Sequence, residues 1–302
     1  MKEELKPIPV TNINGDSLAG DQVILVNQPS LDHQKRHEAI ENFRVQRLTD
    51  FTNALNIKWR ITITYQEGRH GAAIYSNPSQ KTHEILLPKK ADFNVDEYLP
   101  DIAHELCHAR FSEELDSIYS TVRFPKKYGD LNQNTKEYKD FVVKARMMEV
   151  SQAWVDVWIN ELRHNLWPEL TTEDDDGVML SLSRLNDSGQ LLNAWSDGYA
   201  VAVAMILAEQ KRNKSRQHQI GFLMQTLGSE WKKVKKLRDL FEELPLFTKG
   251  GTEFTERAKK DGLKEFEKVA REVAKIFNYP ILPTIKKEVI NSGETFNVWD
   301  FK

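Results

Sequence analysis

The sequence predicts an α+β protein that is mostly helical and contains one small antiparallel sheet. Apolar and polar residues alternate over 59–64, which is the period of a half-buried strand. Glycine and proline then set off two further short strands, at 72–76 and 83–87. From residue 96 onward, long stretches have the length and apolar spacing of helices. We therefore expect a three-stranded antiparallel meander packed against helices, followed by a helical C-terminal region.

The N-terminal segment 1–30 is predicted to form an extended arm. It is punctuated by proline and glycine and contains one apolar run, at 22–26, that indicates a strand. Ser30 suits the N-cap of a helix over 31–55, because its hydroxyl can accept from the exposed amides of the first turn.

Two long helices are expected next, over 102–119 and 137–166, separated by a polar loop at 121–134 that contains proline and glycine. Further helical segments follow, and the tail is expected to be extended or irregular; these helices are predicted at 174–187, 189–211, 214–227, 229–244 and 252–277. We expect one core domain over 31–168 and a helical C-terminal subdomain over 169–302, packed on that core.

The charge balance gives no indication of a nucleic-acid or membrane partner. The 302 residues contain 42 Lys and Arg against 45 Asp and Glu, a formal net charge of −3. The single cysteine, Cys107, excludes an internal disulfide and fits a reducing compartment. No secretory signal and no apolar run of roughly 20 residues is visible. A cytoplasmic location is therefore expected.

One pentapeptide carries the chemistry: His104-Glu105-Leu106-Cys107-His108. Histidines at positions i and i+4 of a helix lie on one face, where both imidazoles can bind one tetrahedral ion. Glu105 follows the first histidine, so it lies beside the metal and can take a proton from a zinc-bound water. The motif therefore predicts one Zn²⁺ ion, with Glu105 as the general base that hydrolyses a peptide bond. The alternative is an amphipathic helix that happens to carry two histidines.

This motif, following a small sheet, resembles the zincin superfamily of metallopeptidases. The resemblance covers about residues 57–165, and its only specific motif is the pentapeptide 104–108. It implies a peptide or protein substrate that pairs in extended form with the strand nearest the motif helix, an edge strand. The candidate edges are the strands at 72–76 and 83–87.

A catalytic zinc of this type needs a third protein ligand and keeps one position for water. Phe111 and Glu114 stand where the metzincin branch has glycine and histidine, so that branch is excluded, and no Gly-Thr-x-Asp segment indicates an aspzincin. The gluzincin branch takes a glutamate from a second helix. Glu149 fits this role, because it lies among apolar residues where an unpaired carboxylate would be costly.

Two alternatives to Glu149 as the ligand stay open. Glu149 could instead be a buried carboxylate paired with an arginine such as Arg146 or Arg110. Glu161 and His164, further along the same predicted helix, are spaced so that they could also bind the metal.

Other acidic and polar residues are assigned supporting roles. Asp156, seven residues after the proposed ligand, is expected on the same helix face, where it would orient a histidine. Tyr199 and His164 are candidates to stabilise the oxyanion. Glu113 and Glu114 lie too close to His108 on one helix to complete the metal site, and they are expected to be solvated.

Two other functions would fit the same residues. The scaffold could belong to a regulatory or binding protein that senses a metal or a partner and cleaves at most one specific regulator. It could also hydrolyse a non-peptide amide, in which case a narrow closed pocket would replace an open groove beside an edge strand. Replacement of Glu105 separates catalysis from metal sensing.

Overall fold

The computed structural model describes residues 23–26, 46–67, 71–89, 98–170, 196–213, 231–289 and 294–302, and the structural statements below refer to these. The chain forms two compact units, Met1–Thr121 and Val122–Lys302, each of which is described by itself. The division lies at the start of the predicted loop 121–134, whereas the boundary predicted from the sequence follows residue 168. Several sequence predictions fall outside the described residues: the arm apart from 23–26, the Ser30 cap, the first part of the helix 31–55, and the helices 174–187 and 214–227.

The sheet of the first unit has four strands in the order β1-β2-β4-β3. These are β1 (Val23–Val26), β2 (Arg60–Gln66), β3 (Ala73–Asn77) and β4 (Thr82–Pro88). The predicted positions are confirmed, but the predicted antiparallel meander is wrong. β2 is parallel to both β1 and β4, and only β3 and β4 pair in antiparallel fashion.

Burial explains why β4 and not β3 lies beside β2. β4 is the more apolar strand, and its Ile85 and Leu87 are fully buried, as suits a strand with neighbours on both sides. β3 exposes 47% of Tyr75, which suits an edge. Alternation in a sequence determines which face of a strand is buried, but it does not determine the neighbouring strand. Of the two candidate edge strands, β3 is therefore the edge, and β4 is interior.

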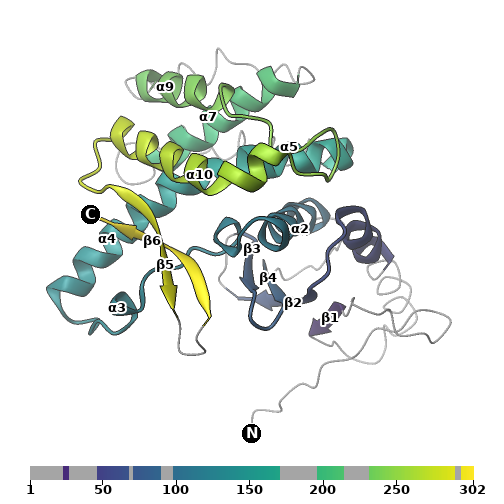
Figure 1. The fold of residues 1–302 in the computed structure, drawn as a ribbon, viewed down its shortest axis with the longest axis horizontal. Coiled ribbons are helices and arrows are strands. Elements are labelled where there is room, and N and C mark those ends of the chain that lie inside the picture. The colour runs from purple at the N-terminus through teal and green to yellow at the C-terminus, as the bar shows by residue number, and fades with distance from the viewer. Residues whose placement is uncertain are drawn as a thin grey trace, which may run out of the picture. The chain divides into compact units, whose positions relative to one another are not determined.

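The motif helix α2 (Leu99–Glu114) packs against β3 and β4 in this unit, as Figure 1 shows. It carries a proline in its first turn, where the missing N–H costs nothing. α2 ends earlier than predicted, and the 3₁₀ turn η3 (Ser117–Tyr119) follows, capped by Asp116, whose carboxylate accepts from Ile118 N. The core of the unit joins α2, the helical residues 46–55 and the sheet, through Leu48, Phe51, Leu55, Ile61, Ile63, Ile74, Ile85, Leu87, Ile102, Leu106, Cys107 and Phe111.

The second unit is mainly helical and ends in a two-stranded hairpin. Its helical elements are α3 (Lys126–Gly129), α4 (Lys136–Gln152), η4 (Ala153–Val155), α5 (Asp156–Leu166), η5 (Pro168–Leu170), α7 (Ser196–Asn213), α9 (Trp231–Glu242) and α10 (Glu256–Ile276). The extended tail forms the antiparallel pair β5 (Pro283–Val289) and β6 (Thr295–Phe301). The predicted class, α+β and mostly helical, is confirmed.

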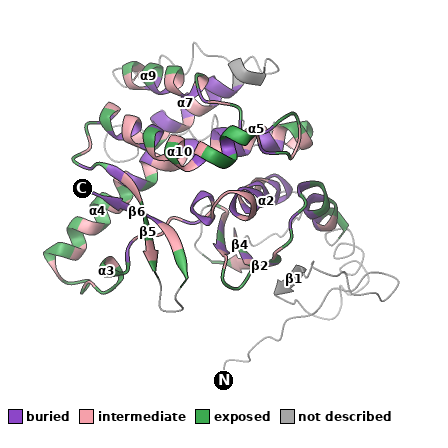
Figure 2. Cartoon of the chain, in the orientation of Figure 1, coloured by how far each residue is buried: buried purple, intermediate pink, exposed green. Residues whose placement is uncertain are grey.

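The helix predicted over 137–166 is divided by η4 into α4 and α5. α4 is not the strongly apolar, buried helix that the sequence suggested, because only Met148 and Ser151 are buried along it. Val143 is 54% exposed, and Figure 2 shows α4 mostly in the colours of exposed and intermediate residues. The apolar residues of α4 are therefore mostly exposed or half-buried, and Glu149 on this helix does not lie in an apolar core.

Aromatic side chains form the core of the second unit below η4 and α5. Trp158 stacks on Phe247 with ring centroids 3.4 Å apart, and its indole N–H donates to the Pro245 carbonyl. Trp154 and Phe266 meet edge to face at 5.4 Å. Rings of this size bury large apolar areas, and this burial stabilises the packing of η4 and α5 in the core of the unit.

Candidate metal centre

α2 exposes only one narrow stripe of its surface. Between Leu99 and Ser112 all residues are buried except Asp101, His104 and His108. Steps of three and four residues place these three side chains on one face of the helix. The predicted histidines therefore lie together at a half-buried position, while the rest of α2 is covered.

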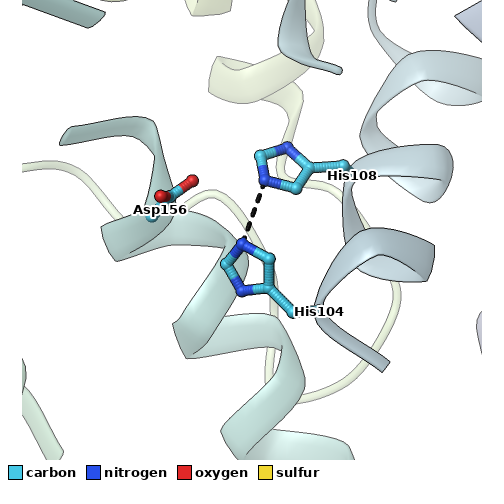
Figure 3. Close-up of side chains that lie close together, drawn as sticks. All are labelled: His104, His108 and Asp156. Atoms are coloured by element: carbon cyan, nitrogen blue, oxygen red, sulfur yellow. Dashed lines mark hydrogen bonds between the residues drawn. The ribbon is translucent and has the colours of Figure 1, made fainter. Parts of the chain in front are cut away.

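The two imidazoles converge on one point. His104 Nε2 and His108 Nε2 are 3.2 Å apart, the contact drawn as a dashed line in Figure 3. Two nitrogen ligands of a tetrahedral zinc, each roughly 2.05 Å from the ion, lie about 3.3 Å apart. The two rings share a hydrogen bond at this distance, and a metal ion bound by both nitrogens would need no large movement of either ring.

A hydrogen bond at Nδ1 determines the tautomer of His108. His108 Nδ1 lies 2.7 Å from the Tyr119 carbonyl oxygen, and a carbonyl can only accept, so Nδ1 carries the hydrogen. On a neutral imidazole this leaves the lone pair on Nε2, the atom that faces His104. The sequence gives no signal for Tyr119 in this role, because every residue carries a carbonyl.

Asp156 joins the two histidines in the structure. One ligand atom each from His104, His108 and Asp156 lies within 4.8 Å of the others, and all three residues are half-buried. Figure 3 shows these three side chains together. Two imidazole nitrogens and one carboxylate oxygen form a donor set that could hold a metal ion.

Glu149, the ligand predicted from the sequence, does not belong to this group. Its side chain is 49% exposed, and its carboxylate lies 3.6 Å from the guanidinium of Arg146. Arg146 is one of the arginines expected from the sequence as an alternative partner to the metal. The 3₁₀ turn η4 lies between Glu149 and Asp156 in the chain.

The other predicted site residues are placed as follows. Glu105 lies on α2 next to His104, and its side chain is buried. Glu161 and His164 lie on α5, and Tyr199 lies in the first turn of α7. These last three are outside the group of metal-ligating atoms that the described residues form. Their proposed roles stay predictions.

Two glutamates at the end of α2 differ from their predicted environment. Glu113 was expected in solvent, but its side chain is only 3% exposed, and it accepts hydrogen bonds from the backbone N–H groups of Lys58 and Trp59. Glu114 is 27% exposed and pairs with Arg110 at 2.7 Å. Partners more than 50 positions away are invisible in the local sequence, which is why Glu113 was misplaced.

Comparison with protein-family models gives no match for this chain, and no curated protein matches its sequence. Among the helices of the described ranges, none is long and apolar enough to cross a membrane.

Proposed function

We propose that the chain is a zinc-dependent metallopeptidase with His104, His108 and Asp156 as its metal ligands and Glu105 as its general base. The observation that carries this proposal is the approach of the two Nε2 atoms to 3.2 Å on the half-buried stripe of α2. The Tyr119 carbonyl holds the hydrogen of His108 on the opposite nitrogen, so the ring is ready to bind a cation without a change of tautomer.

A bound zinc ion supplies Lewis acidity, which polarises the scissile carbonyl and acidifies a water molecule. The protein supplies the remaining functions. Glu105 accepts the proton of the attacking water and passes it to the leaving amine. Asp156 adds one negative charge to two neutral imidazoles, so the ligand set leaves a net positive charge on the centre to attract an electron-rich carbonyl.

The edge strand β3 supports an extended peptide as the substrate. Ser76 N–H donates to the Thr121 hydroxyl at 2.8 Å, so this amide is directed away from β4. In an antiparallel strand the amides two residues apart point to the same side, and the N–H and C=O of Ile74 therefore lie along the same outer edge. A peptide in extended form would pair with this edge, beside the helix that carries the histidines.

The proposal predicts that Glu105→Gln separates zinc binding from catalysis. With fluorescein-labelled casein as substrate, the zinc-loaded wild type should release fluorescent peptides, and Glu105→Gln should cleave on the order of 100-fold more slowly or worse, because proton transfer by a general base contributes 10²–10⁴. Zinc affinity should stay close to that of the wild type, because Glu105 is not a ligand.

Glu114→Gln is the matched control, since it removes a second carboxylate from α2 that is paired with Arg110 and not with the metal group. It should cleave casein like the wild type. A Glu105→Gln variant that binds zinc and cleaves at the wild-type rate would contradict the peptidase proposal.

A further inference from the structure

A chain of buried and half-buried polar side chains connects β3, β4, α2 and the turn η3 of the first unit. We call it the serine–histidine network and define it as Ser76, His83, Ser112, Glu113 and Ser120. Its links are Ser112 Oγ to Ser120 Oγ at 2.5 Å, Ser120 Oγ to Ser76 Oγ at 2.6 Å, Ser76 Oγ to His83 Nδ1 at 2.7 Å and His83 Nε2 to Glu113 Oε1 at 3.1 Å. It begins and ends on neighbouring residues of α2.

The hydrogen bonds of this network have a consistent order of donors and acceptors. Glu113 already accepts from the backbone N–H groups of Lys58 and Trp59, so its carboxylate is an acceptor and His83 Nε2–H donates to it. His83 Nδ1 then accepts from the Ser76 hydroxyl, whose oxygen accepts from Ser120. Each of these hydrogens has an acceptor, which is the condition under which buried polar groups specify one arrangement.

Most of the network is buried, and Ser120 is half-buried. His83 is fully buried, and the Trp59 ring stacks on its imidazole with centroids 5.0 Å apart. Ser76 is also buried. Removal of any member would leave a neighbour unpaired in the interior, so the links fix the positions of β3, β4 and α2 relative to one another.

The same network holds the turn that orients His108. Ser120 and Thr121 follow Tyr119 directly, and the Ser120 hydroxyl also lies 3.2 Å from the Ser117 carbonyl at the other end of η3. The Thr121 hydroxyl accepts from Ser76 N–H. The Tyr119 carbonyl, which accepts from His108 Nδ1, therefore lies in a turn tied on its C-terminal side to β3.

We propose that the serine–histidine network is a positioning device for the metal centre: by holding η3 against β3 it keeps the Tyr119 carbonyl on His108 Nδ1 and so keeps His108 Nε2 available for the metal. This inference rests on the proposed metal site. Ser76, His83 and Ser120 are positioning residues in it, because they act through Tyr119 and touch neither the ligands nor the substrate.

Ser120→Ala tests the inference, since it removes the hydroxyl that links Ser76, Ser112 and Ser117. The dissociation constant for zinc, measured by competition with a chromogenic chelator, should rise by about 10-fold or more, the range found when groups that orient a ligand are removed. In the metal-free protein, the imidazole ¹⁵N shifts of His108 should show the Nδ1–H tautomer in the wild type and a mixture in the variant. Ser76→Ala is a second variant with the same expected result.

Thr52→Val is the matched control, because Thr52 is a buried hydroxyl residue of the same unit, and among the described residues its hydroxyl bonds within its own helix, to the Thr49 carbonyl. It should leave both the zinc affinity and the His108 tautomer unchanged, even where it lowers the melting temperature. A folded Ser120→Ala or Ser76→Ala with wild-type zinc affinity and a wild-type tautomer would overturn the inference.

Failure of the inference can be distinguished from failure of the proposed function. A wild type that binds no zinc would overturn the metal site, while the tautomer measurement on metal-free protein would still show whether the network orients His108. If the wild type, Ser120→Ala and Ser76→Ala all bind zinc with the same affinity, the metal site stands and the positioning role of the network is overturned.

Discussion

Asp156 and Glu149 are the two carboxylates between which the third metal ligand must be chosen. Asp156 is half-buried and shares a group with both histidines, whereas Glu149 is 49% exposed beside Arg146. Asp156→Asn should therefore weaken zinc binding by about 100-fold or more, because loss of a ligand costs at least as much as loss of a group that orients one. Equilibrium dialysis with ⁶⁵Zn measures this change.

Glu149→Gln is the paired variant, with the same chemical change one turn before the break in the helix. It should bind zinc like the wild type. The opposite pattern, with affinity lost in Glu149→Gln and kept in Asp156→Asn, would restore the ligand that the sequence alone suggested.

At the scale of residues, the sequence predicts the parts of the site that lie within one regular helix. His104, Glu105 and His108 are related by helical spacing, and the structure places both histidines on one stripe of α2. Asp156 and Glu113 were assigned other roles, because residues far away in the sequence form their environments. Contacts of this kind cannot be predicted from the neighbouring residues in the sequence.

At the scale of elements, the hairpin of β5 and β6 is joined to α3 by one buried carboxylate. Asp300 accepts hydrogen bonds from Lys286 Nζ at 2.5 Å, Phe301 N at 2.9 Å and Tyr128 OH at 3.0 Å. Burial raises the pKa of Asp300, but these hydrogen bonds outweigh burial and lower the pKa to about 2 from an ordinary value of 3.8. The ionised form is therefore the one that the fold stabilises.

Because the folded-state pKa of Asp300 lies below its unfolded value, its contribution to stability is complete above about pH 4 and is lost as the pH falls toward 2. Asp300→Asn should lower the free energy of unfolding at pH 7 by roughly 2 kcal/mol and should remove this part of the acid dependence. Urea denaturation between pH 2 and pH 7 measures both effects. An unchanged slope below pH 4 in the variant would contradict the assignment.

The strands show what patterning can and cannot predict. Each predicted strand of the first sheet lies within a few residues of its observed position, because alternation and turn residues are local signals. The pairing was wrong because two strands that follow each other, β2 and β3, are separated in space by β4. The apolar character of Ile85 and Leu87 in β4 is the signal that favours an interior strand.

At the scale of the whole molecule, the fold class follows from the sequence, and the predicted subdomain boundary after residue 168 stays a prediction beside the observed division into compact units. The chain divides after Thr121, at the start of the polar stretch 121–134 that was predicted as a loop within one core. Proline and glycine mark a chain reversal and a unit boundary equally well, so composition alone could not separate the two. The motif helix α2 and its sheet consequently form one unit, and α4, α5 and the later elements form the other.

The central claim, a zinc centre built on the two histidines of α2, is tested most directly by X-ray absorption at the zinc edge on the zinc-loaded wild type. The account predicts stoichiometric zinc that survives dialysis and a first shell of nitrogen and oxygen at about 2.0–2.1 Å, with the multiple scattering of two imidazoles. Zinc that is lost on dialysis, or a first shell without imidazole scattering, would contradict it.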